Sequence, residues 1–114
     1  MIVSVQDKPC VVLGSVRPAR TALTRMRGLL GAAWLKPGEG LWIEPCNNVH
    51  MFGMSQAITA IYVAADGTVL QVARLKPWTI GPLVLKARSV LEVSDAEERI
   101  AAGDRLVCSG EAIR

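Results

Sequence analysis

This sequence has few of the residues on which disulfide-stapled, metal-binding or membrane-spanning proteins depend. Only 4% of its 114 residues are aromatic, one is histidine and three are cysteine. Cys10, Cys46 and Cys108 are scattered and form no C-x-x-C pair, which excludes a disulfide framework. No apolar run approaches the roughly 18 residues of a membrane span, and no basic n-region with a sustained apolar stretch follows the first residue. We therefore expect a cytoplasmic protein without a cofactor.

The apolar residues that are present suit one packed core. The chain is 51% hydrophobic, with most of that fraction in Val, Leu, Ile and Ala. Its length is near the usual size of one domain, and no long polar segment divides it. At this length roughly two thirds of the unfolded surface can be buried, so the fold requires no metal or disulfide. We expect a single domain that spans residues 1–114.

The positive charge is modest and spread along the chain. The net charge is +3, with a small cluster at Arg17, Arg20, Arg25 and Arg27. No glycine-rich phosphate loop, RNA-binding aromatic pattern or recognition-helix signature accompanies this cluster, so a solvated helix face explains it better. We expect a small molecule or a protein as partner, no nucleic acid and no membrane, and a monomer or weak dimer.

Seven short segments have the β-branched composition or turn-bounded pattern of strands. The strongest local signal is Asp66-Gly67, which favours a tight hairpin turn between two apolar runs. The proline-rich segment Leu75–Pro82 is expected to be an irregular surface connection. The expected strands are Cys10–Val16, Leu41–Glu44, Ile58–Ala64, Val69–Ala73, Leu83–Leu85, Ser89–Val93 and Arg105–Ser109.

Two segments have helical patterns. From Thr21 to Ala33, apolar residues recur every three or four positions, with Thr21 as the N-cap. Ser94-Asp95-Ala96-Glu97 is a capping-box pattern and predicts a second, short helix that reaches Ala102. Together the elements predict a mainly β (α+β) fold. It would be a small, strongly curved, partly closed antiparallel β-barrel-like sheet with a covering N-terminal helix and a short C-terminal helix.

The densest gathering of unusual side chains surrounds the only histidine, His50. Cys46, His50 and Met54 have the spacing C-x3-H-x3-M, and a thiolate, an imidazole and a thioether suit soft copper ions. A blue-copper centre normally needs a second histidine, which this chain lacks. We therefore favour His50 as a polar anchor that hydrogen-bonds the surrounding turn, and we assign no metal ligand.

An enzymatic alternative is a small hydrolase or transferase. It would use Cys46 as the nucleophile, His50 as the base, and Glu44 or Asp66 to orient the imidazole. No sequence spacing shows that these side chains meet, so we assign no catalytic residue. Whether the protein is an enzyme is left open at this point.

The three tryptophans, Trp34, Trp42 and Trp78, could line a binding groove, because an indole offers a large area with one polar N–H. Trp42 alternates with Leu41 and Ile43, so one face of this strand points away from the core. Closing the ends of a small barrel is the simpler role for the three rings.

Seven short motifs, taken in order, carry a family resemblance. They are Arg27-Gly28-Leu29, Gly40-Leu41-Trp42-Ile43, His50 with Met54, the apolar strand before Asp66-Gly67-Thr68-Val69, Leu75-Lys76-Pro77, Val90-Leu91-Glu92 and Gly103-Asp104. Together they resemble the bacterial and archaeal family catalogued as domain of unknown function 192. The resemblance covers roughly residues 20–109, and its strength lies in the ordered set.

The resemblance implies a compact, mainly β fold with an associated helix and no established biochemical activity. It also implies that the segment around His50 and Met54 is the family's most characteristic surface, since many members have Trp or His about four residues before the Met. Relatives commonly have an Asp shortly after this Met, where this chain has Thr59. A role that depends on that carboxylate is therefore not expected here, and the lack of a signal segment differs from exported relatives.

The leading hypothesis is a non-catalytic binding or accessory module. The polar cluster is local, but the sequence contains no complete catalytic set. The expected pocket or contact surface is built from Trp42, Asn47, Asn48, His50 and Met54.

Overall fold

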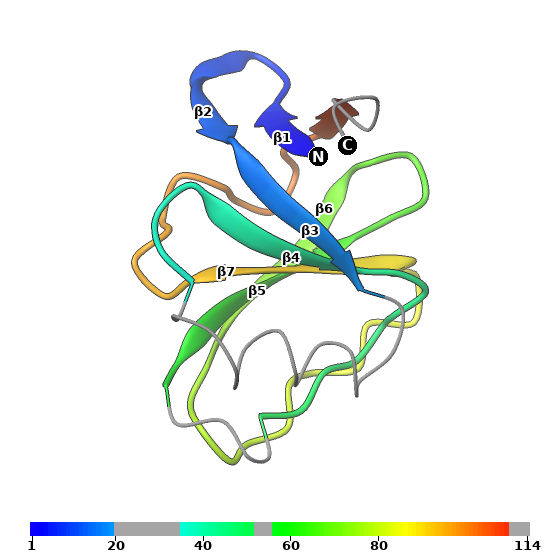
Figure 1. Ribbon diagram of the computed structural model, residues 1–114. Coiled ribbons are helices and arrows are strands. Elements are labelled where there is room, and N and C mark those ends of the chain that lie inside the picture. The colour runs from blue at the N-terminus through cyan, green and yellow to red at the C-terminus, as the bar shows by residue number, and fades with distance from the viewer. Residues whose placement is uncertain (20–34, 52–55, 110–114) are drawn as a thin grey trace.

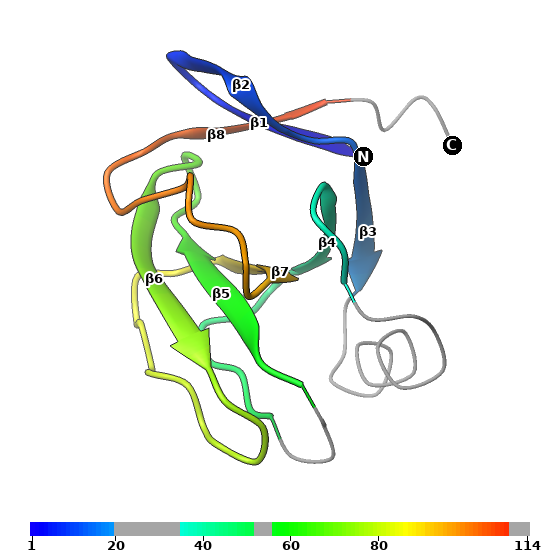
Figure 2. The ribbon, with the colours of Figure 1, turned by 90° about the vertical axis from the view of Figure 1, so that its left-hand side faces the viewer.

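The computed structural model describes residues 1–19, 35–51 and 56–109, and these residues form strands and irregular connections without a helix. Their eight strands are divided between a three-stranded sheet and a five-stranded sheet (Figures 1 and 2). The strands are β1 (Ile2–Val5), β2 (Lys8–Leu13), β3 (Ser15–Ala19), β4 (Glu39–Ile43), β5 (Ile58–Val63), β6 (Val69–Leu75), β7 (Ser89–Ser94) and β8 (Leu106–Ser109).

The five-stranded sheet has the order β3-β4-β7-β5-β6, and its inner strands β5 and β7 are buried along their whole length. Successive side chains of a strand point to opposite faces of the sheet. Ile58, Ala60 and Tyr62 of β5 therefore enter one hydrophobic core, while Ile61 and Val63 enter another. A strand that is apolar at nearly every position needs cover on both faces, and this sheet has it.

Different parts of the chain cover the two faces. The three-stranded sheet, of order β2-β1-β8, packs over one face and contributes Val3, Leu13 and Leu106 to that core (Figure 2). The long connections before β5 and after β6 cover the other face and contribute Val49 and Met51, among others. The protein thus has two cores separated by one buried sheet.

The predicted hairpin between β5 and β6 is confirmed, since these strands pair antiparallel around Asp66-Gly67. Asp66 Oδ1 accepts a hydrogen bond from Thr68 N at 3.0 Å, which closes the turn. Gly67 has a φ of 93°, and a Cβ atom there would lie 2.7 Å from Leu106 O. Both its conformation and its close approach to β8 require glycine.

The N-terminal part of the chain differs from the prediction. The sequence pattern missed β1, and the single expected strand Cys10–Val16 is divided at Gly14 into β2 and β3. Pro18 does not end β3, because β3 is an edge strand and a proline on an edge need not donate to a neighbour.

The expectation of a mainly β protein is confirmed, but the predicted α+β, barrel-like architecture is wrong for the described residues. They form two separate sheets with no helix, not one partly closed barrel-like sheet of an α+β protein, and β3 pairs with β4 in parallel. The apolar pattern of β5 and β7 did not show which segments cover each face, and the sequence therefore led to one partly closed sheet in place of two layers. The expected covering helix at Thr21–Ala33 lies outside the described residues.

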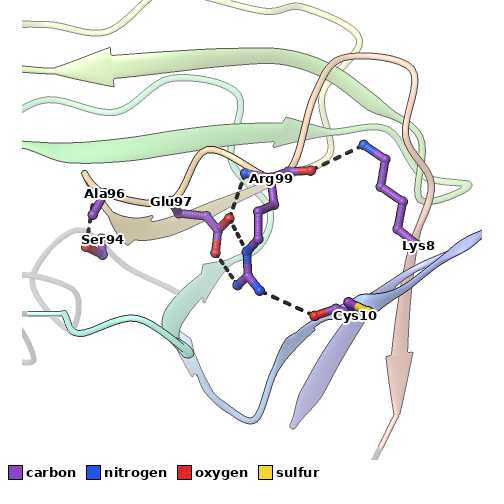
Figure 3. A network of polar contacts seen from close by, with 6 residues as sticks. All are labelled: Lys8, Cys10, Ser94, Ala96, Glu97 and Arg99. Carbon is purple, nitrogen blue, oxygen red and sulfur yellow. Dashed lines mark hydrogen bonds and ion pairs between the residues drawn. The ribbon is translucent and has the colours of Figure 1, made fainter.

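The short C-terminal helix predicted from Ser94 to Ala102 is also wrong, because Glu97 has a different partner. Ser94 Oγ does accept a local hydrogen bond, from Ala96 N at 3.2 Å. The carboxylate of Glu97, however, binds Arg99 through its backbone N (2.9 Å), Nε (3.0 Å) and Nη2 (2.7 Å), as Figure 3 shows. Arg99 Nη1 then donates to Cys10 O at 3.3 Å. These contacts hold an irregular turn against β2 in place of a helix.

Candidate functional site

A polar cluster surrounds Glu44, where the end of β4 meets the start of β7. Oε1 of Glu44 accepts hydrogen bonds from Ser89 Oγ (2.6 Å) and Trp42 Nε1 (3.1 Å), and Oε2 accepts one from Arg88 Nε (3.3 Å). The hydrogen bond from Ser89 and then that from Trp42 lower the pKa of Glu44, and Arg88 adds to the effect. Glu44 is therefore a carboxylate at neutral pH that fixes the orientation of Arg88.

An open hollow with a volume of about 610 Å³ lies beside this cluster, where three segments of the chain meet. Its lining residues are Pro45, Cys46, Asn47, Ala65, Ala87 and Arg88. Backbone hydrogen bonds join the segments, because Cys46 N donates to Arg88 O and Arg88 N donates to Val63 O, both at 2.8 Å. The backbone of Arg88 is thus the junction that holds the hollow together.

The lining of the hollow combines apolar walls with a few hydrogen-bonding groups. Cys46, Asn47 and Arg88 carry the polar side chains. Arg88 binds Glu44 through Nε, so its two terminal amino groups can donate hydrogen bonds to a ligand. A guanidinium with two such groups matches the geometry of a carboxylate. The hollow therefore presents hydrogen-bond donors on an apolar background.

A ribbon of irregular backbone extends from the hollow. Residues 47–51 run antiparallel to residues 78–84, which belong to the connection between β6 and β7 (Figures 1 and 2). Their hydrogen bonds join Gly81 N to Val49 O (2.8 Å), Trp78 N to Met51 O (2.9 Å) and Met51 N to Thr79 O (2.7 Å). The ribbon covers the core that contains Ile58, Ala60 and Tyr62, which we call the first core, and it brings the two loops together.

Close packing around Gly81 fixes the ribbon to the sheet. A Cβ atom on Gly81 would lie 2.8 Å from Tyr62 Oη, 3.1 Å from Leu75 Cδ1 and 3.2 Å from Val49 O. The Tyr62 hydroxyl donates to Pro82 O at 2.8 Å, one residue further along the same connection. The absence of a side chain at Gly81 therefore allows the connection to lie directly over Tyr62.

Tyr62 supports the ribbon as an uncharged hydrogen-bond donor. Burial raises the pKa of Tyr62 to about 12, and the charges of Cys46 and Glu92 act in the same direction. Glu92 is fully buried on β7. The phenol stays protonated at neutral pH and keeps its hydrogen bond to Pro82.

The residues expected from the sequence lie in different places. Asn47 lines the hollow, and Trp42 is connected to it through Glu44. Asn48 is exposed, and its backbone O accepts a hydrogen bond from Cys46 Sγ at 3.0 Å. His50 is half-buried on the ribbon and forms an isolated β-bridge with Ile80. Met54 lies outside the described residues.

Residues 1–19, 35–51 and 56–109 bring together no group of three His, Cys, Asp or Glu side chains able to hold a metal ion. The two carboxylates considered as orienting groups for His50 have structural partners. Glu44 binds Ser89, Trp42 and Arg88, while Asp66 accepts from Thr68 N in the hairpin turn. Both carboxylates therefore have structural hydrogen bonds.

Sequence reasoning missed two residues of this cluster, Arg88 and Ser89, and regarded Glu44 only as a possible orienting group. The sequence does show that polar residues stand at two strand ends, since Glu44-Pro45 ends one strand and Arg88-Ser89 begins another. Pairing β4 with β7 makes the two ends meet, and residues 45 apart in the chain give no local sign of that pairing.

The fold and the hollow define a small, mainly β protein with a surface recess beside an oriented arginine. The chain belongs to the family known as domain of unknown function 192, described as an uncharacterized ACR, whose sequence profile matches residues 2–108. The family resemblance found in the sequence is thereby confirmed. No curated protein matches the chain.

Two solved structures have the same fold. A protein of unknown function from Novosphingobium aromaticivorans superposes with a TM-score of 0.75 at 22% identity, over 95% of this chain and 84% of that one. A protein from Sinorhizobium meliloti, proposed in its description to be a transcription regulator, gives a TM-score of 0.70 at 18% identity, over 93% of this chain and 91% of that one. At these identities the likeness concerns the fold alone. In the described part of the chain, no helix could cross a membrane.

Proposed function

We propose that this protein is a non-catalytic binding or accessory module of the cytoplasm. Its hollow would take a small ligand that carries a carboxylate or carbonyl oxygen. The observation that supports this proposal is the lining itself. Apolar walls from Pro45 and two alanines meet the donors of Asn47 and Arg88 around an open hollow of about 610 Å³, a volume within the range of small-molecule sites.

The oriented guanidinium gives the proposed site its specificity. Glu44 holds Arg88 at Nε, so less side-chain freedom is lost when a ligand binds the terminal amino groups. The Asn47 side chain, on the same lining, can donate to the same ligand oxygen or to a neighbouring one. Of the other residues expected from the sequence, Trp42 acts through Glu44, whereas Asn48 and His50 belong to an adjoining contact surface in this proposal.

The test is a binding measurement with matched probes. We would titrate the folded protein with a panel of small aromatic carboxylates, with the corresponding amides and with the corresponding amines. We expect the carboxylates to bind most tightly. Arg88→Gln should weaken carboxylate binding about tenfold, because it removes a charge-assisted bidentate contact.

Two further variants separate the hollow from its surroundings. Ala65→Leu should block binding by filling the hollow, and Ala102→Leu, at an exposed position away from it, is the matched control. Asn47→Ala should weaken binding, whereas His50→Ala should leave it within twofold. Equal binding of amines and carboxylates, or full binding by the folded Ala65→Leu variant, would contradict the proposal.

The enzymatic alternative predicts a different property of Cys46. An activated nucleophile has a thiol pKa well below the ordinary value of about 8.5 and alkylates rapidly at neutral pH. In our proposal the Cys46 thiol is a hydrogen-bond donor to Asn48 O and alkylates at the rate of an ordinary thiol. Rapid alkylation at pH 6, absent in Cys46→Ser but retained in Cys10→Ser, would support the enzyme instead.

A further inference from the structure

A row of exposed apolar side chains follows the connection between β6 and β7. Of the large hydrophobic residues that the described part of the chain exposes, four lie in residues 78–85. They are Trp78 (66% exposed), Ile80 (63%), Leu83 (58%) and Leu85 (78%). The other two, Val12 and Val107, are each 45% exposed and belong to the three-stranded sheet. We name the four residues of the connection the apolar row.

The apolar row is the outer side of a segment whose inner side is already packed. Gly81 and Ala87 are buried, and Val84 packs against the first core. The outward side chains therefore add nothing to that core. The connection leaves β6 at the end of the five-stranded sheet that lies away from the three-stranded sheet (Figures 1 and 2). Four large exposed apolar side chains within eight residues indicate an interaction surface.

Basic residues border the row on both sides. Arg74 and Lys76 precede it, Lys86 and Arg88 follow it, and residues 74–88 contain no acidic side chain. Arg74 pairs with Asp95 at 2.9 Å, and Arg88 pairs with Glu44 at 3.3 Å. Within the described residues, Lys76 and Lys86 have no ion-pair partner. The row is thus an apolar strip with an uncompensated lysine at each end.

We infer that the apolar row docks on the surface of a lipid bilayer that contains anionic lipid. An indole and aliphatic side chains suit the boundary between headgroups and acyl chains. Lysines beside them bind anionic headgroups while their methylene stems stay in the apolar layer. This inference departs from the sequence-based expectation of no membrane partner, which followed from the modest, dispersed positive charge and did not consider the exposed side chains of this connection.

Two other occupants fit less well. A symmetric contact between two copies would place the same patch on both sides and bring Lys76 and Lys86 of each copy together. An acidic protein would satisfy the lysines but would need a recess shaped to Leu83 and Leu85, which project from an irregular connection. A fluid bilayer receives such side chains without shape complementarity. This surface adjoins the proposed ligand hollow at Arg88, but none of its test variants changes a residue that lines the hollow, and its test does not depend on ligand binding.

The test is co-sedimentation of the full chain with lipid vesicles. One vesicle population is phosphatidylcholine alone, and the other contains a quarter phosphatidylglycerol. We expect binding to the anionic vesicles that weakens with added salt, and little binding to the neutral ones. Lys86→Gln should weaken binding about fivefold, and Leu85→Ser about tenfold.

Matched control variants change the same kinds of residue elsewhere. Arg17→Gln removes an exposed cation from β3, and Val12→Ser removes an exposed apolar side chain from β2. Both should bind the anionic vesicles as the unchanged protein does. Circular dichroism establishes that each variant is folded, and Leu83→Ser replaces Leu85→Ser if that variant does not fold.

Four results would overturn the inference. The folded protein could fail to sediment with either vesicle, or could bind equally well after Leu85→Ser and Leu83→Ser. A dimer in sedimentation equilibrium that disappears in Leu85→Ser would assign the row to a second copy. Binding of a leucine- and glutamate-rich peptide through the row, without vesicle binding, would assign it to an acidic protein.

Discussion

Replacing Gly81 by alanine tests how the irregular ribbon is held on the sheet. The new methyl group would meet Tyr62 Oη at 2.8 Å and Leu75 Cδ1 at 3.1 Å. Overpacking of this kind costs about 1–3 kcal/mol, and displacing the Tyr62 hydroxyl from Pro82 O costs about 1 kcal/mol more. The lower entropy of the unfolded alanine chain offsets about 0.4–1 kcal/mol. We expect a net loss of about 2 kcal/mol in the free energy of unfolding.

Urea unfolding followed by tryptophan fluorescence measures this loss, and Gly14→Ala is its control. Nothing lies within 4 Å of a Cβ atom on Gly14, so that variant should be unchanged or more stable by about 0.5 kcal/mol. Tyr62→Phe removes the oxygen that meets the new methyl group. The double variant Gly81→Ala/Tyr62→Phe should therefore be more stable than the sum of the single losses by at least about 0.5 kcal/mol. Strictly additive losses, or an unaffected Gly81→Ala variant, would refute the packing argument.

Three further predictions concern ionisable groups. Tyr62 is the only tyrosine, so near-ultraviolet absorbance should show one ionisation near pH 12 in the folded protein and near 10 in denaturant. Because the pKa of Tyr62 is raised on folding, the stability that this group contributes is complete below pH 10 and is lost as the pH rises toward 12. A single pKa near 10 in both states would contradict the burial of the phenol. Ser89→Ala should raise the pKa of Glu44 in a carboxyl NMR titration, since the hydrogen bond from Ser89 is the largest cause of the lowered pKa. The lowered pKa contributes stability above about pH 4.5 that is lost as the pH falls, so the stability of this variant should depend less on pH in the acid range. An unchanged pKa of Glu44 in Ser89→Ala would contradict the role given to this hydrogen bond. Arg99→Ala should lower the midpoint of urea unfolding, because the Glu97 side chain is only 3% exposed and loses its ion pair. Arg99→Lys should recover only part of that loss. An unchanged midpoint in Arg99→Ala would show that the pair does not hold the turn.

The parts of the fold that could be predicted are those determined by neighbouring residues. Asp66-Gly67 fixed the hairpin because the turn needs a positive φ at Gly67 and a side-chain acceptor at Asp66. The buried strand at Ser89–Ser94 was likewise visible as a short apolar run. Such signals act over a few residues and do not depend on the rest of the chain.

The parts that could not be predicted depend on distant partners. The capping-box pattern at Ser94 failed because Glu97 binds Arg99, which is in turn held by Cys10 on another strand. The cluster around Glu44 was incomplete for the same reason, since Ser89 reaches it only through the pairing of β4 with β7. In both cases the structure depends on a tertiary contact that the local sequence does not show.

The most direct test of the proposed binding module is a backbone amide NMR titration of the unchanged protein with benzoate. The account predicts saturable shifts at the amides that line the hollow, chiefly Cys46, Asn47, Ala65, Ala87 and Arg88. These shifts should disappear in Ala65→Leu. The absence of saturable shifts with benzoate and every other carboxylate of the panel, or shifts centred elsewhere on the protein, would contradict the account.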